Sequence, residues 1–200
     1  MHQRIIGLYE EHAEAWEAAR REFTPHERPH FDRFIAALPG GARLLDIGCG
    51  SGVPVARELI GRKLQVTGID SSPSMIARCQ RRFPEQEWHV ADMRALHLGR
   101  RFDALLAWYS FFHLHADDQR AMFPIFAAHA APGALLMFTT GPVEGERIGS
   151  WQGEPLYHAS LSQTEYRQLL AASGFETLAF TAGEPLAQGP SVWLARFAGP

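Results

Sequence analysis

Short apolar runs alternate with amphipathic helical patterns along most of this chain, and this alternation restricts the possible folds more than any other feature. Apolar runs of this length are typical of buried strands, and strands separated by helices form parallel sheets that are covered on both faces. The sequence therefore predicts an α/β protein with helices on either side of one sheet. Predicted strands cover residues 43–47, 64–69, 87–90, 103–108, 134–139, 175–181 and 191–197.

Two helices are expected ahead of the first strand. Large side chains recur at steps of three or four over residues 5–23, which predicts one amphipathic helix. A second helical pattern over residues 31–38 ends at Pro39, followed by two glycines.

Later helices are separated by the predicted strands. Ser162 and Glu165 have the spacing of a capping box, and Gly174 supplies a stop for the helix that they begin. Pro124 is expected to kink or split the helix that contains it. These helices are predicted over residues 54–60, from 72 onward, over 117–131 and from 162 to 174.

Composition favours a single domain over residues 1–200. The formal net charge of −3 disfavours nucleic acid as a partner, because the molecule as a whole offers no positive field to a polyanion. No signal peptide and no apolar run long enough to span a membrane is evident, so we expect a cytoplasmic protein without a membrane partner. Cys49 and Cys79 have no metal-like spacing.

The junction between the first strand and the helix after it carries the strongest functional signal. Residues 44–52 read LLDIGCGSG, in which Gly48, Gly50 and Gly52 let the backbone turn sharply and approach a ligand. In open α/β sheets, ligands bind beyond the carboxyl ends of the strands. The spacing differs from the Gly-x-Gly-x-x-Gly of dinucleotide sites, and Asp46 before it would repel a pyrophosphate but attract an ammonium group. Asp46 could alternatively serve only as a cap for the turn.

Three later segments follow in register with this turn. They read VTGID–SSPSM over residues 66–75, VADM over 90–93 and FDALLAWYS over 102–110. With the glycine turn, the set resembles the motifs of class I S-adenosylmethionine (SAM)-dependent methyltransferases, in the order which that family keeps. The resemblance implies a Rossmann-like, three-layer αβα sandwich with a seven-stranded sheet of order 3-2-1-4-5-7-6, the last strand antiparallel.

The resemblance also implies how SAM is held. Asp70 would accept hydrogen bonds from both ribose hydroxyls, with Ser71 beside it and Met75 packed near adenine. Asp92 would take the adenine amino group and Met93 would cover the ring, although Asp92 could also be a solvated loop residue. Trp108 and Ser110 would lie beside the methionine part and face the acceptor.

In related small methyltransferases a leading helix closes over the cofactor, with an aromatic residue near the sulfonium and a basic residue near the methionine carboxylate. Tyr9, Trp16 and Arg20 are the corresponding candidates here. An aromatic stripe at helical spacing is also compatible with simple packing. The resemblance divides the chain into a helical cap over residues 1–40, a cofactor-binding core over 41–140, an acceptor-side lid over 141–160, and a C-terminal helix and hairpin over 161–200.

Candidates for the reaction itself follow the fourth predicted strand. His113 is the candidate general base, because an imidazole titrates near operating pH; it could instead cap the next helix. Phe111, Tyr157 and His158 are candidate substrate-binding residues, the latter two within a glycine-rich stretch over residues 140–160 that shows no clear period. A metal site is not expected, since the His113-x-His115 pair lacks a third ligand nearby.

The sequence therefore predicts methyl transfer from SAM to an oxygen, nitrogen or sulfur atom of a small molecule, which leaves S-adenosylhomocysteine. Two alternatives stay open: an aminopropyltransferase-like enzyme of the same fold, and a non-catalytic SAM-sensing module. The residues from Trp108 to His115 include no acidic side chain of the kind that a polyamine acceptor would need. The sequence identifies neither the acceptor nor the oligomeric state, monomer or homodimer.

Overall fold

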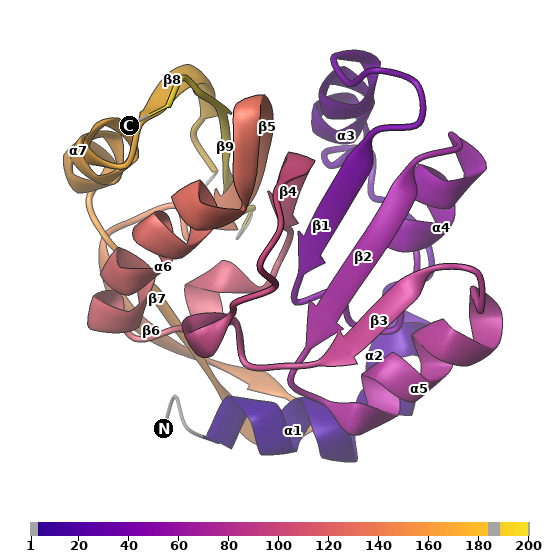
Figure 1. The fold of residues 1–200 in the computed structure, drawn as a ribbon. Helices are drawn as coiled ribbons and strands as arrows, with labels where there is room; N and C mark the ends of the chain where they lie inside the picture. The colour runs from indigo at the N-terminus through magenta and orange to yellow at the C-terminus, as the bar shows by residue number, and fades with distance from the viewer. Residues whose placement is uncertain (1–3, 184–188, 200) are drawn as a thin grey trace.

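The computed structural model describes residues 4–183 and 189–199, and its centre is a seven-stranded sheet of order β3-β2-β1-β4-β5-β9-β8 (Figure 1). β9 is antiparallel to both β5 and β8, whereas the pairs among β1 to β5 are parallel. The order and strand directions confirm the predicted topology. The strands are β1 (Arg43–Ile47), β2 (Gln65–Asp70), β3 (Glu87–Val90), β4 (Phe102–Ala107), β5 (Ala130–Thr140), β8 (Phe175–Thr181) and β9 (Ser191–Phe197).

Alternating side chains of the central strands enter two separate cores. In β4, Leu105 faces one core, and its neighbours Ala104 and Leu106 face the other. The first core packs under α6 (Ala116–His129) and α7 (Gln163–Ala172), and the second under α3 (Arg28–Ala36), α4 (Val55–Gly61) and α5 (Pro73–Arg82). Because both faces are covered, the strands are apolar along nearly their whole length.

The predicted N-terminal helix is broken into two. α1 spans Ile5–Glu11 and α2 spans Ala13–Ala19, with His12 between them outside helical geometry. The single helix predicted over residues 5–23 is therefore wrong. The break lets the two short helices meet different partners: Glu10 contacts Ser72 and Ser74 before and within α5, and Trp16 packs against Trp151.

α6 runs without interruption through Pro124, so the expected split is absent. A proline inside a helix removes one backbone hydrogen bond and crowds the preceding turn. Met122, Phe123 and Phe126 on both sides of it are fully buried in the first core, and their burial holds the helix together across that position.

The stretch over residues 140–160 is a β-hairpin, not the aperiodic loop that the sequence suggested. β6 (Gly145–Trp151) pairs antiparallel with β7 (Glu154–Ser160), so that Ile148 lies opposite Tyr157. Gln152 and Gly153 form the two-residue turn, both with positive φ, at 51° and 82°. Such a turn matches the twist of a hairpin.

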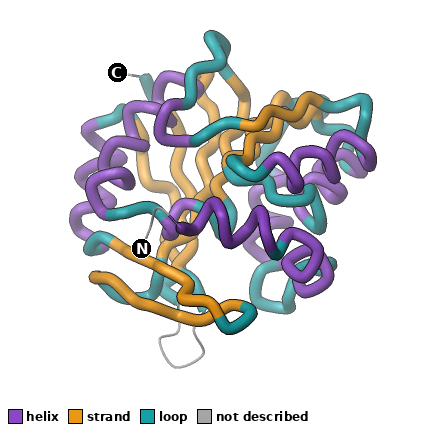
Figure 2. The backbone as a smooth tube through the Cα atoms, turned by 90° about the horizontal axis from the view of Figure 1, so that it is seen from below, coloured by secondary structure: helices purple, strands orange, loops and turns teal. Residues whose placement is uncertain are grey.

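The N-terminal helices and this hairpin lie together beyond the carboxyl ends of the strands (Figures 1 and 2). Contacts join α1 to β7 and to α5, and Figure 2 shows α1 crossing this end of the molecule beside the hairpin. Within residues 4–183 and 189–199, no helix is both long and apolar enough to span a membrane.

We expect Phe138→Ala to lower the free energy of unfolding by about 3–5 kcal/mol, the usual cost of truncating a buried aromatic side chain. Phe138 is fully buried in β5 and stacks on Trp193 with ring centroids 5.8 Å apart. Urea unfolding gives the measurement, with Val143→Ala as the control because Val143 is 46% exposed. Equal losses for both variants would contradict this assignment of the core.

Candidate functional site

A cavity lies where β1, β2 and β4 end, under the two N-terminal helices. Its lining includes every residue predicted to bind the cofactor except Gly52, and it includes His113. These residues are Tyr9, Trp16, Arg20, Asp46, Gly48, Gly50, Asp70, Ser71, Met75, Asp92, Met93, Trp108, Ser110 and His113.

The glycine turn after β1 is held against the neighbouring strands at very short range. The backbone N–H groups of Gly48 and Cys49 both donate to the Ile69 carbonyl, at 2.8 and 2.9 Å. Gly48 has φ +80°, and a Cβ there would lie 2.3 Å from the Cβ of Ser110. Ser110 is itself fixed, because its hydroxyl donates to the Ile47 carbonyl at 2.6 Å. A residue other than glycine at position 48 would therefore separate the turn from β4.

Asp46 is the most unusual group in the cavity wall. Its side chain is 1% exposed, and its Oδ2 atom has no hydrogen-bond partner in the described part of the chain. Burial and the nearby Asp70 carboxylate raise the pKa of Asp46 to about 8. A buried carboxylate without a partner is costly, so this position suits a ligand that brings a positive charge.

Asp70, at the end of β2, is fixed by backbone donors. Its Oδ2 accepts from the Gly50 N–H and its Oδ1 from the Ser72 N–H, each at 2.9 Å. Burial raises the pKa of Asp70, and these two hydrogen bonds oppose that shift. Each oxygen retains a lone pair, so the carboxylate can accept from two vicinal hydroxyls.

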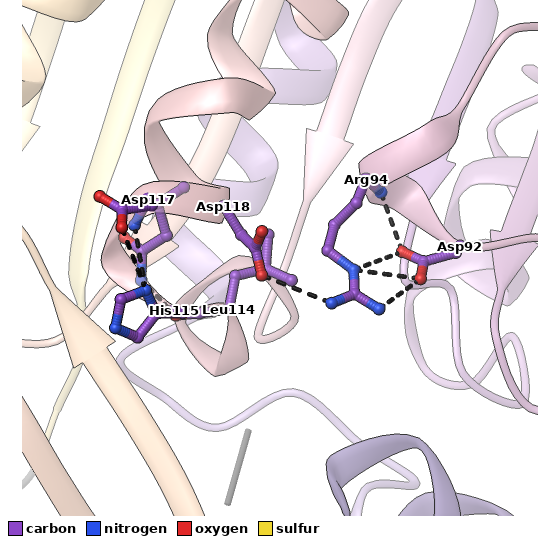
Figure 3. Close-up of polar contacts among 7 residues, drawn as sticks. Asp92, Arg94, Leu114, His115, Asp117 and Asp118 are labelled. Atoms are coloured by element: carbon purple, nitrogen blue, oxygen red, sulfur yellow. Dashed lines mark hydrogen bonds and ion pairs between the residues drawn. The ribbon is translucent and has the colours of Figure 1, made fainter. Parts of the chain in front are cut away.

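Asp92 does not lie free in the cavity wall but is held by Arg94 (Figure 3). The Arg94 Nε lies 3.0 Å from both Asp92 oxygens, and the NH1 nitrogen of Arg94 lies 3.4 Å from Asp118 Oδ2. The Arg94 hydrogen bonds lower the pKa of Asp92. Arg94 and Asp118 both line the cavity, and sequence reasoning missed them because they come from separate elements, η2 (Met93–Ala95) and α6.

Aromatic rings from the N-terminal helices line the opposite side. The rings of Tyr9 and Trp16 meet edge to face with centroids 5.0 Å apart, and Trp16 meets Trp151 of the hairpin at 5.4 Å. Trp108 after β4 is buried, and its indole N–H has no partner among the described residues.

His113 is paired with Tyr9. Its Nε2 lies 2.7 Å from the Tyr9 hydroxyl, and its Nδ1 lies 2.9 Å from the Tyr157 carbonyl. Because a carbonyl only accepts, Nδ1 carries the proton and Nε2 accepts from Tyr9. Burial and the neighbouring His158 lower the pKa of His113 to about 3, against the opposing effect of the Tyr157 carbonyl. His113 is therefore neutral at physiological pH and only weakly basic.

Arg20 lies at the end of α2 and faces two further groups. Its NH2 nitrogen donates to Glu27 Oε1 at 2.5 Å, and its guanidinium lies 4.4 Å from the centre of the Tyr109 ring. Tyr109 lines the cavity and Glu27 is buried behind it. Sequence reasoning missed both, although the Thr24-x-x-Glu27 spacing is a capping-box signal that could have indicated a structured turn.

Four predicted site residues do not line the cavity. Phe111 is fully buried among Phe123, Phe138 and other rings of the first core, so its predicted contact with substrate is wrong. Its ring lies against Phe123 and Phe126 of α6. The other three are Gly52, which packs near Cys79 and Phe83, and Tyr157 and His158, which lie in β7 behind His113.

No group of three potential metal-binding side chains of the His, Cys, Asp or Glu type occurs in the parts of the chain that the structure describes.

Comparison with known proteins identifies the family. Residues 16–179 match the family model described as a methyltransferase domain, which is most of the chain. The chain belongs to the methyltransferase domain family. This methyltransferase-family chain resembles SAM-bound CalS10, an amino pentose methyltransferase from Micromonospora echinaspora, with a TM-score of 0.70 and 24% identity; the match covers 92% of this chain and 96% of that one. At this identity the likeness shows a shared fold.

Two curated relatives of this methyltransferase-family chain act on amino sugars. It is 37% identical over 101 residues, half of its length, to the dTDP-3-amino-3,6-dideoxy-alpha-D-glucopyranose N,N-dimethyltransferase of Streptomyces fradiae. It is 29% identical over 151 residues, 67% of its length, to the dTDP-4-amino-2,3,4,6-tetradeoxy-D-glucose N,N-dimethyltransferase of Saccharopolyspora spinosa. The matches span 39% and 60% of those two proteins.

We expect the buried Asp46 carboxyl to make the ligand-free protein less stable as pH rises from about 4 to 8. In that interval the unfolded chain has lost the Asp46 proton while the folded protein, with its pKa near 8, still holds it. The free energy of unfolding therefore falls with pH, by at most about 1.4 kcal/mol per pH unit from this group.

Urea unfolding at several pH values measures this slope. The raised pKa of Asp70 also makes the free energy of unfolding fall with pH. The contribution of Asp46 is therefore the difference between the slopes of the wild type and Asp46→Asn, and the slope of Asp46→Asn should be shallower. Parallel slopes for the wild type and Asp46→Asn would contradict the assignment.

Proposed function

We propose that this chain transfers a methyl group from SAM to a small-molecule acceptor. The observation that carries the proposal is Asp46, a buried acidic side chain whose Oδ2 has no hydrogen-bond partner among the described residues, beside a glycine turn that lines the cavity. Membership of the methyltransferase domain family supports the same reaction. SAM, when bound, supplies a methyl group on a positively charged sulfur atom that an acceptor lone pair can attack.

The residues of the cavity match the chemical groups of SAM one by one. Asp46 would receive the ammonium group, directly or through water, and Arg20 the carboxylate. Asp70 would hold the ribose hydroxyls, with Ser71 beside it. Asp92, kept ionised by Arg94, would accept from the adenine amino group. The remaining predicted contacts are close backbone approach at Gly48 and Gly50, packing by Met75, Met93 and Ser110, and the aromatic faces of Tyr9, Trp16 and Trp108.

We further propose that the acceptor atom is a nitrogen. The pKa of His113, near 3, makes it a poor base for removing a proton from a hydroxyl group, which holds its proton far more tightly. A neutral amine already has a lone pair and needs no base before it reacts. The Tyr9 hydroxyl, fixed by His113, would orient the acceptor, and the two relatives that act on amino sugars support this chemistry.

Cofactor binding is the first test. We expect calorimetry to show binding of S-adenosylhomocysteine, and Asp70→Ala to weaken it by about 1.5–3 kcal/mol, the scale of hydrogen bonds to a charged group. Asp103→Ala is the matched control, because Asp103 lies at the start of β4, away from the cavity, and its carboxylate pairs with Arg43 alone among the described residues. Binding of NAD without binding of S-adenosylhomocysteine would refute the proposal.

Methyl transfer is the second test. Methyl-labelled SAM is incubated with the protein and separate pools of amino sugars, other amines and hydroxylated metabolites. Label should appear in an amine-bearing pool. Label only in hydroxylated compounds would refute the nitrogen proposal, and tight cofactor binding without any transfer would favour a non-catalytic SAM-binding module.

Once an acceptor has been identified, we expect His113→Ala to lower kcat roughly tenfold to a hundredfold, because the Tyr9 hydroxyl loses the hydrogen-bond partner that orients it. In the wild type, kcat should show no inflection from His113 between pH 6 and 7, since its pKa lies near 3. An inflection near pH 6.5 that vanishes in His113→Ala would show instead that His113 titrates as a base.

A further inference from the structure

Glu27 is a buried carboxylate in the turn between α2 and α3, and it does not line the cavity. It is 3% exposed and forms a capping box with Thr24: the Thr24 N–H donates to Glu27 Oε2 at 2.6 Å, and the Glu27 N–H donates to the Thr24 hydroxyl at 3.3 Å. Burial alone would raise the pKa of Glu27, but the hydrogen bonds from Thr24 and Arg20 outweigh it and hold the pKa below its usual range. The carboxylate is thus ionised and fixed in direction.

The second oxygen of this carboxylate faces Arg20. The NH2 nitrogen of Arg20 donates to Glu27 Oε1 at 2.5 Å, and the flat face of the guanidinium covers the Tyr109 ring at 4.4 Å. The Tyr109 backbone is in turn held in the left-handed region, at φ 54°, with its N–H donating to the Thr139 hydroxyl at 2.9 Å. A carboxylate at one edge and a ring on one face fix both the position and the tilt of the guanidinium.

Arg20 differs in this respect from Arg94, the other guanidinium in the cavity lining. Arg94 gives Nε and NH2 to Asp92 and NH1 to Asp118. Among the described residues, the only carboxylate that Arg20 bonds is Glu27, through NH2, and its guanidinium also interacts with the Tyr109 hydroxyl. A guanidinium carries five N–H donors in a rigid fork, so the contact with Glu27 fixes Arg20 while leaving the fork able to pair with a further carboxylate.

We propose that Glu27 is a positioning residue for the cofactor: it fixes the Arg20 guanidinium so that Arg20 pairs with the carboxylate at the amino-acid end of the ligand. This inference rests on the proposed function. A free arginine side chain must lose considerable rotamer freedom when it binds, and a guanidinium that is already fixed avoids most of that loss. Glu27 would therefore act on ligand affinity without touching the ligand.

The test uses two ligands that differ only in the carboxylate: S-adenosylhomocysteine and its decarboxylated form, S-adenosyl-3-thiopropylamine. Calorimetry should show that the wild type binds S-adenosylhomocysteine at least about tenfold more tightly than the decarboxylated ligand. Glu27→Gln should remove most of this preference and leave the Kd of the decarboxylated ligand within about twofold. Glutamine can still close the capping box with Thr24, but it brings no negative charge to Arg20.

Two further variants separate positioning from folding. Thr24→Ala removes the hydroxyl half of the capping box, which accepts from the Glu27 N–H, and keeps the Thr24 N–H bond to Glu27 and the Arg20 contact. It should therefore lower the melting temperature and keep the ligand preference. Glu27→Asp keeps the charge on a shorter side chain and should retain part of the preference, which provides a second measurement if Glu27→Gln does not fold.

The outcomes are distinct. If Glu27→Gln weakens the binding of both ligands equally, Glu27 has a merely structural role and the proposal is overturned. An unchanged preference in Glu27→Gln, or equal affinities of the wild type for the two ligands, would also overturn it. If the wild type binds neither ligand, the proposed function itself fails.

Discussion

The close contact between the turn after β1 and the ends of β2 and β4 is the constraint on which the rest of the site depends. Gly48 and Cys49 share the Ile69 carbonyl, and the Ser110 side chain occupies the space that a Cβ on Gly48 would need. This contact brings the Gly50 N–H to the Asp70 carboxylate. If the turn were displaced, the wall that contains Asp46 and Asp70 would lose its geometry.

Two acidic side chains, those of Asp46 and Asp70, lie close together in the cavity wall, and burial raises the pKa of both. The Asp70 carboxylate adds to the cost of ionising Asp46, and Asp46 gains no hydrogen bond at Oδ2 within the described residues to offset its burial. Such an arrangement lowers the stability of the ligand-free protein. A bound cationic ligand would offset this loss of stability, because its positive charge stabilises the ionised carboxylates. Binding sites are commonly less stable than the rest of a protein when the ligand is absent.

The cover of the cavity is built from parts that lie far apart in the sequence. Glu10 of α1 accepts hydrogen bonds from Ser72 and Ser74 at the start of α5. Glu17 of α2 pairs with Arg82 at the end of α5. These contacts hold the N-terminal helices over the glycine turn, and the hairpin packs beside them through Tyr157 and Ile5. We therefore expect the choice of acceptor to depend on the helices and the hairpin together.

The sequence by itself determined the sheet and the cofactor side of the cavity. Strand periodicity, glycine spacing and the carboxylates Asp46, Asp70 and Asp92 are local signals, since each depends on the few residues around it. The strands form one seven-stranded sheet, and the three carboxylates line one cavity. The hairpin carries a weak sequence signal, because its turn is Gln152-Gly153 and not the Asn-Gly or Asp-Gly pair typical of such turns.

Only the tertiary structure decided the remaining contacts. The break at His12, the continuity of α6 through Pro124, the burial of Phe111 and the pairs Tyr9–His113 and Arg20–Glu27 all depend on which surfaces meet. The partners Tyr9 and His113 are 104 residues apart in the sequence, and no local pattern encodes such a meeting. The low pKa of His113 follows from its burial in the folded protein. The sequence alone therefore suggested a general base, and only the fold shows a weakly basic partner of Tyr9.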